Sequence, residues 1–299
     1  MRAFLLKATL YCAVLAAITA GALVWAVGGF VDAFYGKFTQ PARSLVVGSS
    51  RAAQGIDPAL LGAECAQPFL NFAFTNANSP YGPGYLRAIR RKVPADTRGG
   101  LFILEVNPLL VSIDLEKERE DESTFRERDL TLDRQFVFDL DPNFDYLLRN
   151  FREPLYRLAL PEHRRANQAL HASGWHEVRL DESANARAAR QRLGVQRYAD
   201  VFARYRSSPL RVEWLRRTIA ELRPHGRVVL VRIPTSPGMA ELENAYAPDF
   251  SARMATTEGV EFFDFIGEGA TYETTDGNHL TAAAARKFSA ALGQRLRKP

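Results

Sequence analysis

The chain contains little cysteine and little histidine. Its 299 residues include two cysteines, Cys12 and Cys65, and five histidines. Cys12 falls in an uncharged N-terminal segment, so Cys65 is the only cysteine of the remaining chain, which excludes an internal disulfide and a cysteine zinc site there. The histidines lack the spacings that are typical of metal ligands. We therefore expect no metal and no other cofactor.

A strong charge of either sign is also lacking. Lysine and arginine total 39 and aspartate and glutamate total 34, which gives a net charge of +5. An excess this small gives little reason to expect a nucleic-acid partner, and we expect none. Hydrophobic residues make up 46% and charged residues 24%, so disordered and collagen-like classes are excluded. The slightly negative mean hydropathy excludes a polytopic membrane protein.

Charged residues are absent from residues 8–31. About 20 apolar residues are enough for a helix to cross a bilayer, so we expect a single-pass anchor over 8–31. Arg2 and Lys7 precede the segment, which indicates a cytoplasmic tail over 1–7 and an extracytoplasmic, periplasmic remainder held at the cell inner membrane. The alternative is a cleaved signal peptide, whose apolar part usually spans about 7–15 residues. We favour the anchor because Trp25 and Phe30 extend the apolar character beyond that length.

Short apolar segments alternate with helical patterns after a linker over 32–42. We expect strands over 44–47, 69–74, 101–106, 227–233 and 260–265, and helices over 85–92, 209–222 and 281–296. Buried strands that alternate with helices favour a mainly parallel sheet of about five strands, covered by helices on both faces. The sequence therefore predicts one extracytoplasmic α/β domain over 43–299, with three α/β/α layers.

The middle of this domain departs from the pattern. Residues 143–160 and 184–205 read as helices, and we interpret about 114–208 as a helical insertion. Acids and bases alternate along residues 114–133. We expect that charged stretch to be a solvated loop or helix face, because such runs usually remain in water.

Polar residues follow the expected strands. Ser49 and Ser50 come directly after the first strand, Asn107 follows the third, and Asp276 and His279 precede the last helix. Each alone reads as a turn or a helix cap. Together they suggest a catalytic triad, because parallel strands bring their carboxyl ends to one edge of the sheet. Ser50 would be the nucleophile, His279 the general base and Asp276 the residue that orients the imidazole.

This arrangement resembles the SGNH (GDSL-like) hydrolases over about residues 43–108 and 227–299. The Gly-Asp-Ser block reads Gly48-Ser49-Ser50 here, and Asp-x-x-His reads Asp276 to His279. In the second block Asn71 is followed five residues later by Asn76 instead of glycine. In the third, Gly-x-Asn-Asp reads Glu105-Val106-Asn107-Pro108. The resemblance implies a flavodoxin-like sheet, and it departs from the family at positions 49, 76, 105 and 108.

The resemblance also implies roles for individual residues. The Asn107 side chain and the Asn76 N–H would hold the oxyanion, together with the Ser50 N–H. Ser49 is the alternative nucleophile. Arg51 would either pair with an acid in the core or bind an anionic substrate.

The serine block and the anchor together are similar to the membrane-anchored D-alanyl transfer proteins and polysaccharide O-acyl esterases or transferases. That similarity implies a serine esterase or O-acyltransferase acting on acyl esters, acetyl or similar, of a cell-envelope polysaccharide, with a membrane acyltransferase as a further partner. Two alternatives stay open. One is a catalytically inactive relative that binds a polysaccharide or an envelope-assembly partner, and the other is a membrane-tethered domain with a structural role.

Overall fold

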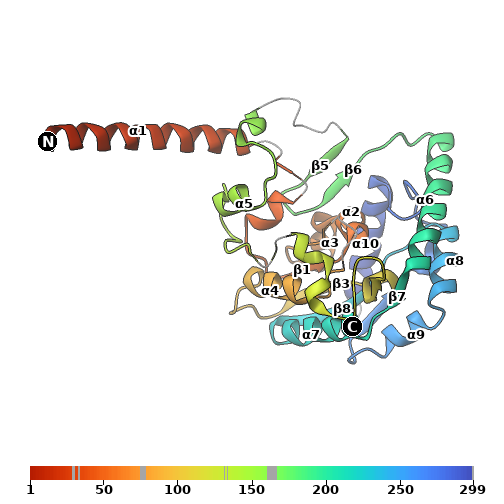
Figure 1. Cartoon of the computed structure of the whole chain (residues 1–299). Helices are drawn as coiled ribbons and strands as arrows, with labels where there is room; N and C mark the ends of the chain where they lie inside the picture. Colours follow the sequence, from red (N-terminus) through yellow and green to blue (C-terminus); the bar gives the residue numbers. More distant parts are fainter. Residues whose placement is uncertain are drawn as a thin grey trace.

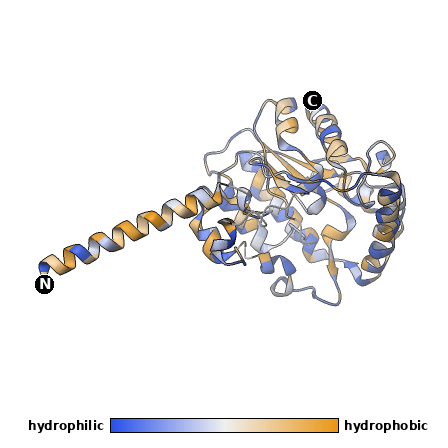
Figure 2. Ribbon diagram, turned by 90° about the horizontal axis from the view of Figure 1, so that it is seen from above, coloured by the Kyte–Doolittle hydropathy of each residue, from blue (hydrophilic) through white to orange (hydrophobic). Residues whose placement is uncertain are grey.

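A long helix projects from an α/β domain in the computed structural model (Figure 1). The structure describes residues 1–28, 31–32, 34–74, 79–130, 132, 134–159 and 167–297. Helix α1 (Arg2–Val27) is long and apolar enough to span a membrane, and almost all of its side chains are exposed. Figure 2 shows the apolar residues distributed all around α1 rather than on one face. A helix that is apolar on every side suits a lipid environment.

Five strands form one parallel sheet in the order β2-β1-β3-β8-β9. The strands are β1 (Leu45–Val47), β2 (Leu70–Asn71), β3 (Gly100–Glu105), β8 (Gly226–Arg232) and β9 (Glu261–Asp264). All five strand segments expected from the sequence are therefore confirmed. The edge strand β2 is shorter than expected, although the Phe72 N–H still donates to the Val46 carbonyl at 2.7 Å.

Helices cover both faces of this sheet. Alternate strand residues point to opposite faces, so Val46 and Ile103 lie in one core while Leu45 and Phe102 lie in the other. The first core is covered by α2 (Ser50–Gly55), α3 (Pro58–Cys65) and α10 (Ala282–Arg297). The second is covered by α4 (Pro83–Lys92), α7 (Pro209–Leu222) and α9 (Phe250–Ala255). The three-layer α/β/α architecture with a mainly parallel sheet is confirmed.

The segment between β3 and α7 contains helices and two small antiparallel sheets. Helix α6 (Ala184–Arg204) closely matches the expected range. Helix α5 (Phe144–Arg149) is shorter and ends at Asn150, and a short 3-10 helix, η5 (Leu155–Ala159), follows after Pro154, which cannot continue an α-helix across 143–160. The sequence patterns did not indicate the pairs β4 (Ser112–Asp114) with β7 (Tyr205–Ser207) and β5 (Gln168–Leu170) with β6 (His176–Val178). Three-residue strands are too short to show a period.

The remaining elements are short, apart from helix α8 (Pro237–Tyr246), which follows β8. They are the 3-10 helices η1 (Tyr35–Phe38), η2 (Pro108–Val111), η3 (Glu122–Thr124), η4 (Arg126–Leu130), η7 (Arg223–His225) and η8 (Ile266–Glu268).

Most of the described charged side chains at 114–133 are exposed, as expected of a solvated loop, but three acids depart from that expectation. Asp114, Glu118 and Glu127 are buried. Arg211 of α7 binds Glu118 at 2.6 Å and Glu127 at 3.0 Å through its two terminal nitrogens. Burial raises the pKa of Glu127 to about 7, against the opposing effect of the Arg211 charge. Alternating charge in the sequence therefore conceals an ion-pair cluster that joins the 114–133 stretch to α7.

Replacing Arg211 by leucine is expected to lower the free energy of unfolding by about 3–5 kcal/mol, because two carboxylates lose their buried partner. Because the pKa of Glu127 is higher in the folded protein than in the unfolded chain, the folded state binds the proton more tightly. The stability that this proton contributes is fully present below about pH 4.5 and is lost as the pH rises through 7. The loss in Arg211→Leu should therefore be smaller at pH 5 than at pH 8 in urea unfolding. Arg216→Leu on the same helix, which removes an exposed ion pair, should cost under about 1 kcal/mol. Equal losses in the two variants would contradict this account.

Candidate active site

Three side chains form a continuous hydrogen-bonded chain at the carboxyl edge of the sheet. The Ser50 Oγ lies 2.8 Å from His279 Nε2, and His279 Nδ1 lies 2.9 Å from Asp276 Oδ2. The carboxylate can only accept, so Nδ1 carries the imidazole proton and Nε2 is free to accept the Ser50 proton. This is the order of contacts in a Ser-His-Asp triad.

Glu105 at the end of β3 organises the turn that presents Ser50. Its carboxylate accepts hydrogen bonds from the Ser49 N–H at 2.7 Å and the Ala52 N–H at 3.2 Å. The Ser49 hydroxyl also contacts this carboxylate at 3.0 Å. A Cβ at Gly48 would lie 2.5 Å from Glu105 Oε2, so only glycine fits there. The strand therefore turns sharply into α2, and Ser50 becomes its first residue.

The backbone around Ser50 leaves one donor free. Ser49 and Ala52 give their N–H groups to Glu105, and the Arg51 N–H donates to the Ser49 hydroxyl at 3.3 Å. Within the described part of the chain, the Ser50 N–H has no acceptor. The Asn107 side chain donates to Glu105 at 2.8 Å through one of its two amide hydrogens. The second hydrogen remains available, and Asn107 lines the same cavity as Ser50.

The loop before α10 holds the acid and the base. The backbone N–H groups of Asn278 and His279 donate to Asp276 Oδ1 at 3.0 and 2.9 Å. Burial favours the neutral carboxyl, but the hydrogen bonds and the charge of His279 outweigh it and hold the pKa of Asp276 well below its usual range. Gly277 has a φ of +87°, a left-handed conformation that favours glycine. Asp276 is therefore ionised and fixed by backbone contacts that do not depend on the imidazole.

Three further side chains, those of Asn278, Tyr198 and Arg51, form hydrogen bonds beside His279. The Asn278 side chain donates to the Tyr198 hydroxyl at 2.8 Å and lies 3.2 Å from His279 Nε2. Arg51 Nε donates to the Asn278 oxygen at 2.7 Å, and the Arg51 guanidinium forms a buried ion pair with Glu243. Arg51 thus pairs with a core acid, one of the two roles expected from the sequence, and it also holds Asn278 in place.

Helix α6 packs directly on the catalytic loop. A Cβ at Gly194 would lie 2.0 Å from the Asp276 carbonyl oxygen, so the helix approaches the loop as closely as a glycine allows. Arg190 Nε donates to the Thr275 carbonyl at 3.0 Å, and Gln191 Nε2 lies 3.0 Å from the Thr274 hydroxyl. The segment between β3 and α7 therefore helps to fix the acid and base.

Gly194→Ala is expected to displace Asp276 and slow the reaction of Ser50 with a fluorophosphonate probe by roughly 10- to 100-fold, because shifts near 1 Å in reacting groups have effects of that size. Alanine also favours helix, so α6 itself should remain folded. Gly238→Ala in α8 is the matched control, since the nearest atom to the new Cβ would be 3.7 Å away. Equal labelling rates in both variants and the wild type would show that α6 does not position the loop.

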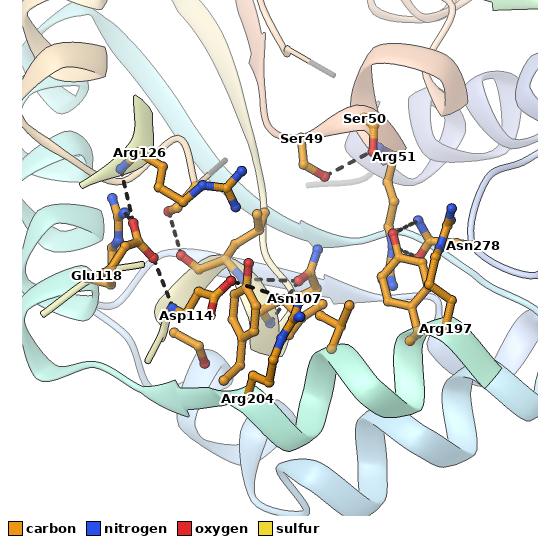
Figure 3. A pocket seen from close by; sticks show the side chains of 18 of the residues that line it. Ser49, Ser50, Arg51, Asn107, Asp114, Glu118, Arg126, Arg197, Arg204 and Asn278 are labelled. Carbon is orange, nitrogen blue, oxygen red and sulfur yellow. Dashed lines mark hydrogen bonds and ion pairs between the residues drawn. The ribbon is translucent and has the colours of Figure 1, made fainter. Parts of the chain in front are cut away.

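The triad opens into a cavity of about 420 Å³. Figure 3 shows Ser49, Ser50, Arg51 and Asn278 at one end and Asp114, Glu118 and Arg126 at the other. Arg197 and Arg204 of α6 close one wall between these ends. Volumes of roughly 300–1,000 Å³ are typical of small-molecule sites, so the cavity can hold a substrate segment beside Ser50.

The structure brings together Ser50, His279, Asp276 and Asn107, four of the site residues expected from the sequence. Asn76, the other expected oxyanion residue, lies outside the described residues. The alternative nucleophile, Ser49, is engaged with the Glu105 carboxylate and caps α2.

Sequence reasoning gave no role to Glu105, Asn278 or Tyr198. Glu105 carries a visible signal, a single acid in an otherwise apolar strand. Asn278 and Tyr198 meet only through tertiary folding, 80 residues apart.

No family model and no curated protein matches this chain. The proposed chemistry of the site therefore rests on its geometry.

Proposed function

We propose that the protein is a serine esterase or O-acyltransferase that acts on acyl esters of a cell-envelope polysaccharide. The observation that carries the proposal is the hydrogen-bonded chain Ser50–His279–Asp276, with contacts of 2.8 and 2.9 Å, at one end of a substrate-sized cavity. The unoccupied Ser50 N–H and the Asn107 amide supply donors where a tetrahedral oxyanion would form. This arrangement favours catalysis over an inactive binding role.

The proposed reaction has two halves. His279 Nε2 takes the Ser50 proton while Oγ attacks the ester carbonyl, and the oxyanion is held by the Ser50 N–H and Asn107. As the intermediate collapses, the ester C–O bond breaks, the leaving alcohol takes the proton from His279, and an acyl-Ser50 remains. Water or a sugar hydroxyl then gives a proton to His279 and attacks the acyl group, and Ser50 leaves with that proton.

The proposed location is the cell inner membrane. Helix α1 is long and apolar enough to cross a membrane, and Arg2 and Lys7 favour a cytoplasmic N-terminus. The α/β domain would then lie on the periplasmic side, where envelope polymers and a membrane acyltransferase partner are accessible. An acyltransferase partner would deliver the acyl group, and the cavity would receive the polymer.

The full chain in detergent should react with a fluorophosphonate probe, and tryptic peptides should carry the adduct on Ser50. The same preparation should hydrolyse 4-nitrophenyl acetate or transfer its acetyl group to an added sugar. Folded protein that forms no adduct and turns over no ester would reject the enzymatic proposal in favour of a binding protein.

A further inference from the structure

The walls of the cavity carry an excess of positive charge. Two acidic residues line it, Asp114 and Glu118. Six basic residues line it as well: Arg51, Lys117, Arg126, Arg197, Arg204 and Arg211. A net charge of +5 spread over 299 residues does not predict such a local excess. Which of these charges are already neutralised within the protein decides what the cavity can bind.

Three of the six cations have carboxylate partners. Arg51 pairs with Glu243, and Arg211 binds both Glu118 and Glu127. Arg204 contacts Glu116 at 3.4 Å. A further contact, from Arg204 to Asp114, measures 4.0 Å, so both acids that line the cavity face arginines.

The other three cations remain uncompensated. Within the described ranges, Lys117, Arg126 and Arg197 have no carboxylate within ion-pair distance. Arg126 lies beside the Tyr205 hydroxyl, and Figure 3 shows its side chain extending from the far wall toward Ser49. Lys117 and Arg197 are exposed, so their charges can meet a ligand without a large desolvation cost.

We infer that the cavity takes an anionic substrate, a polymer segment whose carboxylate or phosphate groups bind Arg126, Arg197 and Lys117 while an ester carbonyl lies at Ser50. Arginine and lysine bind both anions through charge-assisted hydrogen bonds. The ester chemistry rests on the proposed function, whereas the recognition of charge rests on the cavity alone. A neutral polymer would make no charge-assisted hydrogen bonds to these three cations and would gain no affinity from their charge.

The test measures binding without catalysis. Full-length Ser50→Ala protein in a nonionic detergent is titrated calorimetrically with a galacturonic acid tetramer, with the same tetramer converted to primary amides, and with a glycerol phosphate tetramer. At least one anionic tetramer should bind about tenfold or more tightly than the amide, since a charged hydrogen bond contributes roughly that factor. The tighter of the two identifies carboxylate or phosphate as the recognised group. Equal affinities for all three ligands would overturn the inference.

Charge-neutralising variants locate the binding. Combining Lys117→Gln, Arg126→Gln and Arg197→Gln should reduce the affinity for the preferred anion to that for the amide. The control combines Arg128→Gln in η4 and Arg192→Gln in α6, two arginines that lie on the same elements as Arg126 and Arg197 but do not line the cavity, and it should leave binding unchanged. Equal weakening by both sets would overturn the inference. Fluorophosphonate labelling of Ser50 in the wild type reports the proposed chemistry separately, so failure of one leaves the other measurable.

Discussion

Replacing Ser50 by alanine is expected to abolish covalent labelling by a fluorophosphonate and to lower kcat on an acetyl ester by roughly 10⁶-fold, as when the serine of a comparable triad is lost. Ser50 provides the only hydroxyl that the described residues place on His279 Nε2, at 2.8 Å. The substitution removes one hydrogen bond at the first position of α2, so the free energy of unfolding should change by only about 1 kcal/mol. Intact-mass spectrometry and urea unfolding measure the two effects.

Ser49→Ala is the matched control for Ser50→Ala. Ser49 caps α2 and contacts the Glu105 carboxylate at 3.0 Å, so its loss should cost about 0.5–2 kcal/mol of stability. The adduct on Ser50 should still form, because the Ser50–His279 contact does not pass through the Ser49 hydroxyl. Labelling that survives in Ser50→Ala and disappears in Ser49→Ala would make Ser49 the nucleophile.

The sheet could be predicted because its strands are short apolar segments that end at turn residues. β1 stops at Gly48 and β3 stops before Asn107-Pro108, and both signals are local. The pair β4–β7 could not be predicted, because it joins Ser112 to Ser207, which are far apart in the sequence. Its register depends on the position of α6, the helix that leads back to β4. Local patterns therefore reveal the parallel core and miss the small sheets that long-range packing creates.

The candidate triad could be predicted for a topological reason. Ser50 and His279 are 229 residues apart in the sequence. Ser50 follows strand β1 and His279 precedes helix α10, and both lie at the carboxyl ends of the parallel strands. Glu105 was harder to interpret, because its function as an acceptor for the Ser49 and Ala52 N–H groups depends on two adjacent strands in register. Motif spacing thus indicates the reacting groups, whereas the residues that position them, such as Glu105, are identified only when the pairing of the strands is known.

The excess positive charge of the cavity walls could not be predicted from the sequence. Lys117 and Arg126 occur in a stretch of alternating charge, where neighbouring acids suggest local cancellation. Folding buries Glu118 and Glu127 against Arg211 instead, so those acids neutralise an arginine of α7 rather than their neighbours. The charges left over converge on the cavity from η4, from α6 and from the residues that follow β4. The proposed preference for anions therefore comes from ion pairs between different elements, and the amino-acid composition does not show which charges pair.

Asp276→Asn is expected to lower kcat by about 10⁴-fold with the fold intact. Asp276 Oδ1 accepts the backbone N–H groups of Asn278 and His279, and an asparagine oxygen can keep both bonds. Its amide NH₂ would then replace Oδ2 beside His279 Nδ1, at the contact that measures 2.9 Å in the wild type. A donor there makes Nδ1 an acceptor, moves the imidazole proton to Nε2 and leaves no base for Ser50.

The tautomer argument separates Asp276→Asn from a variant that simply removes the carboxylate. Asp276→Ala loses the two backbone contacts as well, so it should unfold at lower urea concentration, whereas Asp276→Asn should unfold close to wild type. Added formate should restore part of the activity of Asp276→Ala by placing a carboxylate beside Nδ1, and it should not rescue Asp276→Asn, whose amide fills that position. Wild-type kcat in Asp276→Asn would remove Asp276 from the triad and leave Ser50 and His279 acting as a pair.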